Sequence, residues 1–99
     1  MADTPETKFK MKVRSELKKI PGLWFYKASD RAASGIPDII GCYQGRFFAW
    51  ELKVPPNKLK RGSLQEHVVL QILESGGLAR EVVPDTLASA IKELTCLPG

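Results

Sequence analysis

The sequence holds few of the residues that build zinc sites or disulfide frameworks. There are two cysteines, Cys42 and Cys96, and one histidine, His67, and no spacing among them resembles a zinc site. We therefore expect reduced core thiols in a cytoplasmic protein. His67 falls on the polar side of its predicted helix, which favours a surface residue over a general base.

Long apolar runs are also missing. No stretch approaches the roughly 18 apolar residues of a membrane span, and no apolar run follows the charges near the N-terminus. The chain is expected to be neither membrane-spanning nor secreted. Its 99 residues suffice for one domain, residues 1–99, and its net charge of +4 suits a polyanionic partner.

Hydrophobic periodicity and capping signals predict a mixed sheet flanked by helices, in the order αβββαβα. Thr4 and Pro5 begin the first helix, and Ser63 with Glu66 forms a capping box for the second. Residues 29–35 and the basic segment 55–62 are expected to be loops. The predicted helices cover 4–20, 63–75 and 84–94, and the predicted strands cover 23–28, 38–43, 46–54 and 78–83.

The two middle strands are expected to form a hairpin around Gln44-Gly45. Counting outward from this turn places Asp38 opposite Glu51, with Cβ atoms about 4.5–5.5 Å apart. Two carboxylates at that distance repel by about 3 kcal/mol at an effective dielectric near 20, which a metal ion would offset. Period-two alternation puts Lys53 beside Glu51. A surface hairpin with solvated side chains is the alternative, and aromatic residues on both faces disfavour it.

The first helix supplies a third acid. Glu6 lies near the centre of the apolar stripe and Glu16 at its margin. An acid within a buried stripe needs a partner or a metal, although interaction with the helix dipole would also explain Glu6. We favour Glu6 for the site and keep Glu16 as the weaker candidate. The stripe consists of Phe9, Val13, Leu17 and Ile20.

Gln65 lies near the centre of the apolar face of the second helix. It is either a satisfied buried amide, a phosphate ligand, or a residue that orients Lys53. Cations crowd the first helix, where a solvated face and a DNA contact are equally expected. A further group of cations could grip a nucleic-acid backbone beside the site, namely Lys27, Lys58, Lys60 and Arg61.

These motifs resemble the PD-(D/E)XK nuclease superfamily, and more closely its VRR-NUC family of virus-type replication and repair nucleases. The resemblance runs from the segment around Glu6 through Gly35-Ile36-Pro37-Asp38 and Glu51-Leu52-Lys53 to Leu64-Gln65. It implies a restriction-endonuclease-like αβββαβ core, here followed by a C-terminal helix. The element order read from periodicity agrees with this α/β architecture.

The resemblance also implies roles for residues of this chain. Asp38 and Glu51 would ligate Mg²⁺ or Mn²⁺, with the carbonyl of Leu52 as a further ligand. Lys53 would position or activate the attacking water and stabilise charge on the phosphate. Glu6 matches the family's first-helix acid, which helps complete the metal site. Gln65 matches the family's helix glutamine.

Small phage and bacterial members of this family resemble Holliday-junction resolvases and act as homodimers. We therefore expect a metal-dependent endonuclease for branched DNA in the cytoplasm of a bacterial or phage-infected cell. The alternatives are a repair nuclease for flaps or duplex ends, and a non-catalytic nucleic-acid-binding module on the same fold. An RNA-binding protein with a stacking platform is disfavoured, because the aromatic residues are expected in the core.

Overall fold

The computed structural model describes residues 4–28 and 35–96. The predicted order of elements is confirmed, and so is the α/β fold class. The predicted loop 29–35 lies outside the described residues except for Gly35. The elements are α1 (Pro5–Lys18), β1 (Leu23–Lys27), β2 (Ile39–Tyr43), β3 (Arg46–Leu52), α2 (Leu64–Glu74), β4 (Leu78–Val82), a 3₁₀ turn η1 (Pro84–Thr86) and α3 (Leu87–Thr95).

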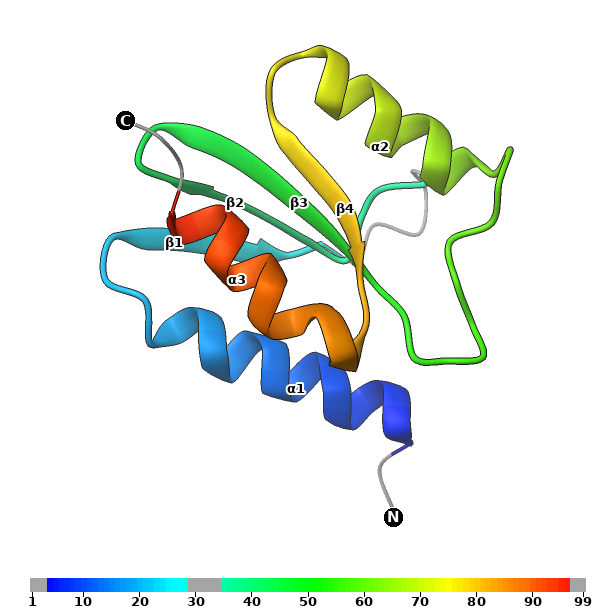
Figure 1. The fold of residues 1–99 in the computed structure, drawn as a ribbon, viewed down its shortest axis with the longest axis horizontal. Coiled ribbons are helices and arrows are strands. Elements are labelled where there is room, and N and C mark those ends of the chain that lie inside the picture. Colours follow the sequence, from blue (N-terminus) through cyan, green and yellow to red (C-terminus); the bar gives the residue numbers. More distant parts are fainter. Residues whose placement is uncertain (1–3, 29–34, 97–99) are drawn as a thin grey trace.

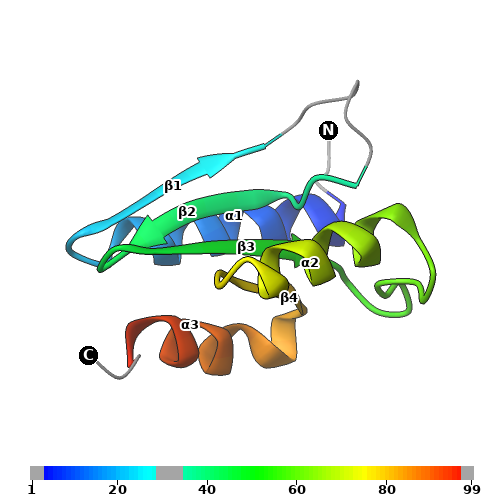
Figure 2. The same ribbon diagram turned by 90° about the horizontal axis from the view of Figure 1, so that it is seen from above.

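The four strands form one sheet in the order β1-β2-β3-β4. The first three strands are antiparallel neighbours, whereas β4 runs parallel to β3. A parallel neighbour requires a crossover connection, and α2 supplies it. The helices α1 and α3 cover one face of the sheet, and α2 lies on the other (Figures 1 and 2).

The main core lies between the sheet and the α1–α3 layer. The alternation predicted for β3 is confirmed, because Phe48, Trp50 and Leu52 enter this core while Ala49 packs under α2. The apolar stripe of α1 is buried there at Phe9, Val13 and Leu17. The remaining buried members are Ile39, Val82, Leu87, Ala90 and Leu94.

The predicted capping residues, Thr4 and Ser63, are the N-caps of α1 and α2. The Thr4 hydroxyl accepts a hydrogen bond from the Thr7 amide at 3.1 Å, and Pro5 occupies the first helical position. The Ser63 hydroxyl likewise accepts from the Glu66 amide at 3.2 Å.

The predicted capping box of α2 is formed only in part. The Glu66 carboxylate accepts from the Gly62 amide at 2.8 Å instead of the Ser63 amide. The reason is that the Ser63 amide already donates to the Lys60 carbonyl in the preceding turn.

Two expectations about burial are wrong. Helix α2 contacts β3 and β4 but leaves the part of its sheet face over β1 and β2 open, because a single helix of 11 residues covers only the strands that it joins. Trp24 and Tyr26 on β1 are therefore 61% and 56% exposed. Phe47 lies on β3 beside α2 and is 42% exposed. The thiols of Cys42 and Cys96 are free as expected, but both are exposed and not in the core.

None of the helices in the described ranges has the length and apolarity needed to traverse a bilayer.

Candidate active site

The β2–β3 hairpin has the predicted register. Its turn residues, Gln44 and Gly45, have positive φ angles of 53° and 79°, as a two-residue hairpin turn that matches the strand twist requires. The paired residues run from Tyr43↔Arg46 to Ile39↔Trp50. One further step places Asp38 beside Glu51 at the end of the hairpin. The turn and the strand alternation together thus bring the two predicted acids to one place.

Asp38 is anchored to the backbone of β3. Its Oδ2 accepts a hydrogen bond from the Leu52 amide at 2.9 Å, and its own carbonyl accepts from the Ala28 amide at 2.9 Å, beyond the end of β1. The other carboxylate oxygen, Oδ1, lies 3.7 Å from the Lys10 ammonium. The side chain of Asp38 is 25% exposed, so it remains open to solvent and ligands.

The segment leading to Asp38 packs on the start of α2, and Gly35 permits this contact. Gly35 has a φ of 89°, a region that side chains with a Cβ disfavour. A Cβ at this position would lie 2.8 Å from the Leu64 carbonyl oxygen. Glycine is thus required both by the backbone angle and by the close approach to α2, and it fixes where the loop delivers Asp38.

Glu51 is the buried member of the pair, with 3% of the residue exposed. Its Oε2 accepts a hydrogen bond from the Gln65 amide at 3.1 Å and lies 3.5 Å from the Lys53 ammonium. Its Oε1 is buried and has no hydrogen-bond partner within the described part of the chain. A buried acceptor without a partner carries a desolvation cost, and the charge of Asp38 adds repulsion to the Glu51 carboxylate.

This environment disfavours the charged form of Glu51. Burial, followed by the charge of Asp38, raises the pKa of Glu51 to about 7, and the nearby Lys53 ammonium offsets only part of that rise. A cation between the two acids would reverse the balance, since it would attract both carboxylates at once. The electrostatics of the site therefore favour a bound cation.

Lys10 belongs to this cluster, although its position in the first helix had suggested only a solvated or DNA-facing cation. Its ammonium lies 3.2 Å from Glu6 Oε1, in addition to the contact with Asp38. Burial would lower the pKa of Lys10, but the Asp38 and Glu6 carboxylates outweigh burial and raise it. The i, i+4 spacing from Glu6 is the signal in the sequence that could have identified this residue.

The two candidate acids of the first helix differ in position. Glu6 is exposed, with 52% of its side chain accessible, so the argument that it sits within a buried stripe is wrong, because the first turn of α1 extends past the core. It still reaches the site through Lys10. Glu16 lies ten residues further, about 15 Å along the helix, and pairs with Lys19 at 3.0 Å.

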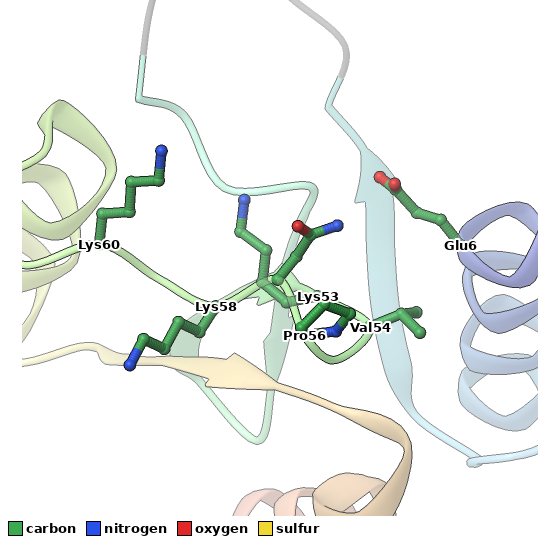
Figure 3. A pocket seen from close by; sticks show the side chains of 7 residues that line it. Glu6, Lys53, Val54, Pro56, Lys58 and Lys60 are labelled. Atoms are coloured by element: carbon green, nitrogen blue, oxygen red, sulfur yellow. The ribbon is translucent and has the colours of Figure 1, made fainter.

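A pocket of about 400 Å³ reaches the site through Lys53, whose ammonium contacts Glu51; Asp38 and Glu51 themselves are not part of its lining. Glu6 borders it from α1, and the segment after β3 forms the other wall (Figure 3). In this view Lys53 and Lys60 extend in the same direction, whereas Lys58 extends the opposite way. The lining residues are Glu6, Lys53, Val54, Pro56, Asn57, Lys58 and Lys60.

The other two predicted DNA-binding cations lie outside this pocket lining. Arg61 is exposed near the start of α2. Lys27 is exposed at the end of β1. It pairs with Ile39, the residue that follows Asp38 in the chain. Because Ile39 faces the α1–α3 core, Lys27 projects from that side of the sheet.

Glu81 is a further residue that the sequence did not single out. It lies on β4 in register with Glu51, and its carboxylate accepts a hydrogen bond from the Leu59 amide. This contact ties the segment that carries Lys58 and Lys60 to the edge of the sheet beside the site. No periodicity or motif marks Glu81, because its partner lies 22 residues away in the chain.

The donor set fits a hard divalent cation such as Mg²⁺. Carboxylate oxygens are its preferred protein ligands, and it usually retains several waters and needs few protein groups. Within the described ranges, no group of three or more acidic, histidine or cysteine side chains gathers around one point. Asp38 and Glu51 are the carboxylates that would hold such a cation, and Oε1 of Glu51, which has no partner among the described residues, is available for this role.

Comparisons with known proteins relate this chain to nucleases by fold. No protein-family model and no curated protein sequence matches it. Among solved structures, a VRR_NUC domain is similar with a TM-score of 0.70 and 21% identity, over 91% of this chain and 97% of that one. The Holliday junction resolvase Hjc of Archaeoglobus fulgidus is similar with a TM-score of 0.55 and 22% identity, over 79% of this chain and 68% of that one.

At these identities the similarity concerns the fold. It confirms the resemblance in fold to a VRR_NUC domain that the motifs had indicated.

Proposed function

We propose that this protein is a divalent-metal-dependent endonuclease that hydrolyses phosphodiester bonds in branched DNA, as a Holliday-junction resolvase. The observation that supports this most directly is the convergence of Asp38, Glu51 and Lys53 at the end of the hairpin, where one buried carboxylate oxygen has no partner among residues 4–28 and 35–96. The fold similarity to a VRR_NUC domain and to a Holliday junction resolvase supports the same conclusion. Such a protein would act on DNA in the cytoplasm, in repair or in phage replication.

In this proposal Asp38 and Glu51 hold Mg²⁺ or Mn²⁺, the Leu52 carbonyl is a further ligand, and Glu6 helps complete the site. The metal would lower the pKa of a bound water and offset charge on the phosphate. No covalent nucleophile from the protein is required.

The side chains around the acids have separate tasks. Lys53 places a fixed positive charge where oxyanion charge develops on the phosphate, and it orients the attacking water. Gln65 holds Glu51 through its amide, and the Leu52 amide holds Asp38. These contacts keep both carboxylates oriented before substrate arrives, so that little reorganisation is needed during the reaction.

Cations outside the metal site would hold the DNA backbone. We assign this role to Lys27, Lys58, Lys60 and Arg61, and the net charge of +4 supports a polyanionic substrate. A four-way junction has approximate two-fold symmetry, so paired incisions are most simply made by an isologous homodimer.

The direct test is a cleavage assay on four DNA substrates: a four-way junction, a flap, a nicked duplex and a linear duplex. We expect Mg²⁺-dependent incision, with the junction cut fastest. Lys53→Ala should reduce the rate by about 10²–10³-fold, the usual loss on removing one electrostatic group from such a site. Asp38→Ala should abolish cleavage, because it removes a proposed metal ligand, and both variants should keep the fold and much of the DNA affinity.

A charge-matched control is Lys92→Ala, because Lys92 is exposed on α3 and has no assigned role. It should retain the wild-type rate. Equal cleavage of all four substrates would end the junction preference and leave a general or flap nuclease. DNA binding without scission at any Mg²⁺ or Mn²⁺ concentration would favour a non-catalytic binding module. A fully active Lys53→Ala protein would contradict the assigned chemistry.

A further inference from the structure

The open part of the sheet face carries aromatic side chains that the core does not use. β1 is the edge strand farthest from β4, and α2 packs over the β3–β4 half of the sheet (Figure 2). Trp24 and Tyr26 on this strand are 61% and 56% exposed, and Phe47 on β3 is 42% exposed. Three half-exposed aromatic residues on one small domain form an apolar surface that a binding partner would stabilise.

The strand registers place these rings in rows that lead to the acids. Trp24 pairs with Cys42, which pairs with Phe47 in the first row. Tyr26 pairs with Ile40 in the second row. Directly opposed residues share a face of the sheet.

Asp38 comes next along the same face of β2, two residues before Ile40, and Glu51 lies beside it. Successive rows are about 6.6–6.8 Å apart. The aromatic rows and the proposed catalytic acids therefore form one continuous track on the same sheet face.

The charges along this track favour a polyanion over a second copy of the chain. On the sheet face that carries Trp24 and Tyr26, the residues of β1, β2 and β3 before Glu51 include no carboxylate, and Lys53 lies beside Glu51 at the end of the track. Lys27 and Arg46 are on the opposite face, because they pair with Ile39 and Tyr43, which pack in the α1–α3 core. A second copy would also bring its own net charge of +4 to this surface. A nucleic-acid strand instead offers phosphates to Lys53 and base faces to the rings.

We propose that Trp24 and Tyr26 form a stacking platform for an unpaired DNA strand that leads into the Asp38–Glu51 site. This inference rests on the proposed function, which it deepens by naming the feature of branched DNA that is recognised. Aromatic rings stack on any base, so the platform would select unpaired nucleotides without selecting a sequence. The chain would thereby distinguish a branch point, where bases can be exposed, from a continuous duplex.

The two tryptophans make the proposal directly measurable. Trp24 is exposed whereas Trp50 is 1% exposed, so a stacked base should quench the fluorescence of Trp24 and leave that of Trp50 largely unchanged. The wild-type protein is titrated with oligo(dT) in EDTA, where no cleavage can occur. We expect quenching in the wild type, and no quenching in Trp24→Leu, in which Trp50 is the only remaining tryptophan.

Affinities complete the test. Trp24→Leu and Tyr26→Leu should each weaken oligo(dT) binding about tenfold and change duplex affinity less than about twofold. The plot of log affinity against log salt should keep its slope and only shift, because no phosphate contact is removed. Trp24→Phe retains a ring and should restore most of the affinity. Leu73→Ala, which removes an exposed apolar side chain from α2, is the matched control and should bind as the wild type does.

Three outcomes would overturn the proposal. One is unchanged oligo(dT) affinity in both leucine variants. Another is an equal loss for single-stranded and duplex DNA. The third is a Trp24→Leu protein that sediments as a smaller species than the wild type, which would assign the surface to a second copy of the chain. Because the titration is done without metal, its failure leaves the cleavage assay with Lys53→Ala intact as a separate result.

Discussion

Glu51 is the residue whose environment says most about the site. Its carboxylate is buried beside another carboxylate and keeps one oxygen without a partner among the residues described. In a purely structural position this arrangement would only cost stability. It is physically reasonable where a cation completes the site, since the same groups then become ligands.

The raised pKa of Glu51 predicts a stability that depends on pH. The folded chain binds a proton on Glu51 up to about pH 7, whereas an ordinary glutamate releases it near 4.5. In metal-free protein the free energy of unfolding should therefore fall as pH rises between these values, by a few kcal/mol at most. Urea unfolding in EDTA at pH 5 and pH 8 measures this change.

Glu51→Gln supplies the matched control, because the amide has nearly the same shape and does not titrate. We expect this contribution to be absent in the variant. We also expect Mg²⁺ to stabilise the wild type at pH 8 and to have little effect on the variant. Parallel pH profiles for the two proteins would show that Glu51 keeps an ordinary pKa.

The position of Lys10 predicts that its ammonium competes with a metal ion for the Asp38 and Glu6 carboxylates. Its ammonium lies between Glu6 and Asp38 and already neutralises part of their charge. Lys10→Met removes this cation and keeps most of the side-chain volume, so Mn²⁺ should bind about fivefold more tightly, as expected for a loss of about 1 kcal/mol of repulsion. Isothermal titration calorimetry would measure the affinity. Lys12→Met, on an exposed part of the same helix, should leave it unchanged, and a weaker affinity in Lys10→Met would exclude competition.

At the scale of elements, the site depends on two strands and two helices that meet at the end of the hairpin. β2 begins next to Asp38, β3 ends with Glu51 and Leu52, α1 brings Lys10, and α2 brings Gln65 within its first turn. The segment from 53 to 63 returns the chain from β3 to α2 and carries the basic residues past this point. It is held to the sheet by the packing of Leu59 against Ala49 and Ala79 and by the hydrogen bond from the Leu59 amide to Glu81.

We expect Glu81→Ala to release this segment and weaken DNA binding about three- to tenfold, the effect of losing one hydrogen bond that positions the phosphate-contacting lysines. The cleavage rate at saturating DNA should stay close to that of the wild type. Fluorescence anisotropy and single-turnover kinetics separate the two quantities. Glu81→Gln keeps an acceptor oxygen and should bind DNA nearly as well as the wild type. Equal losses in both variants would attribute the effect to charge and not to the position of the segment.

At the scale of the whole molecule, size and symmetry decide how a junction could be cut. A chain of 11.0 kDa presents one set of the proposed catalytic residues, whereas junction resolution would require two incisions placed symmetrically. We predict that sedimentation equilibrium gives about twice the chain mass for the free protein, or two chains per four-way junction for the complex. A stable 1:1 complex that makes two unlinked incisions would contradict the dimer while leaving the nuclease activity in place.

The sequence by itself determined the features that depend on neighbours along the chain. Thr4 and Ser63 mark helix starts because their hydroxyls cap amides three residues on. The hairpin register follows from a two-residue turn and period-two alternation, so the approach of Asp38 to Glu51 could be predicted from counting alone. These are short-range constraints, and local residue types suffice to state them.

Only the tertiary structure decided which distant groups meet at the acids and which apolar residues stay exposed. Lys10, Gln65 and Glu81 reach the site region from α1, α2 and β4, and their partners follow from how these elements pack. From the sequence, Trp24 and Tyr26 are expected in the core, because aromatic residues in strands are usually buried. They are exposed because α2 spans only the strands it connects, and the reach of a crossover helix across a sheet is set by packing and not by any local pattern.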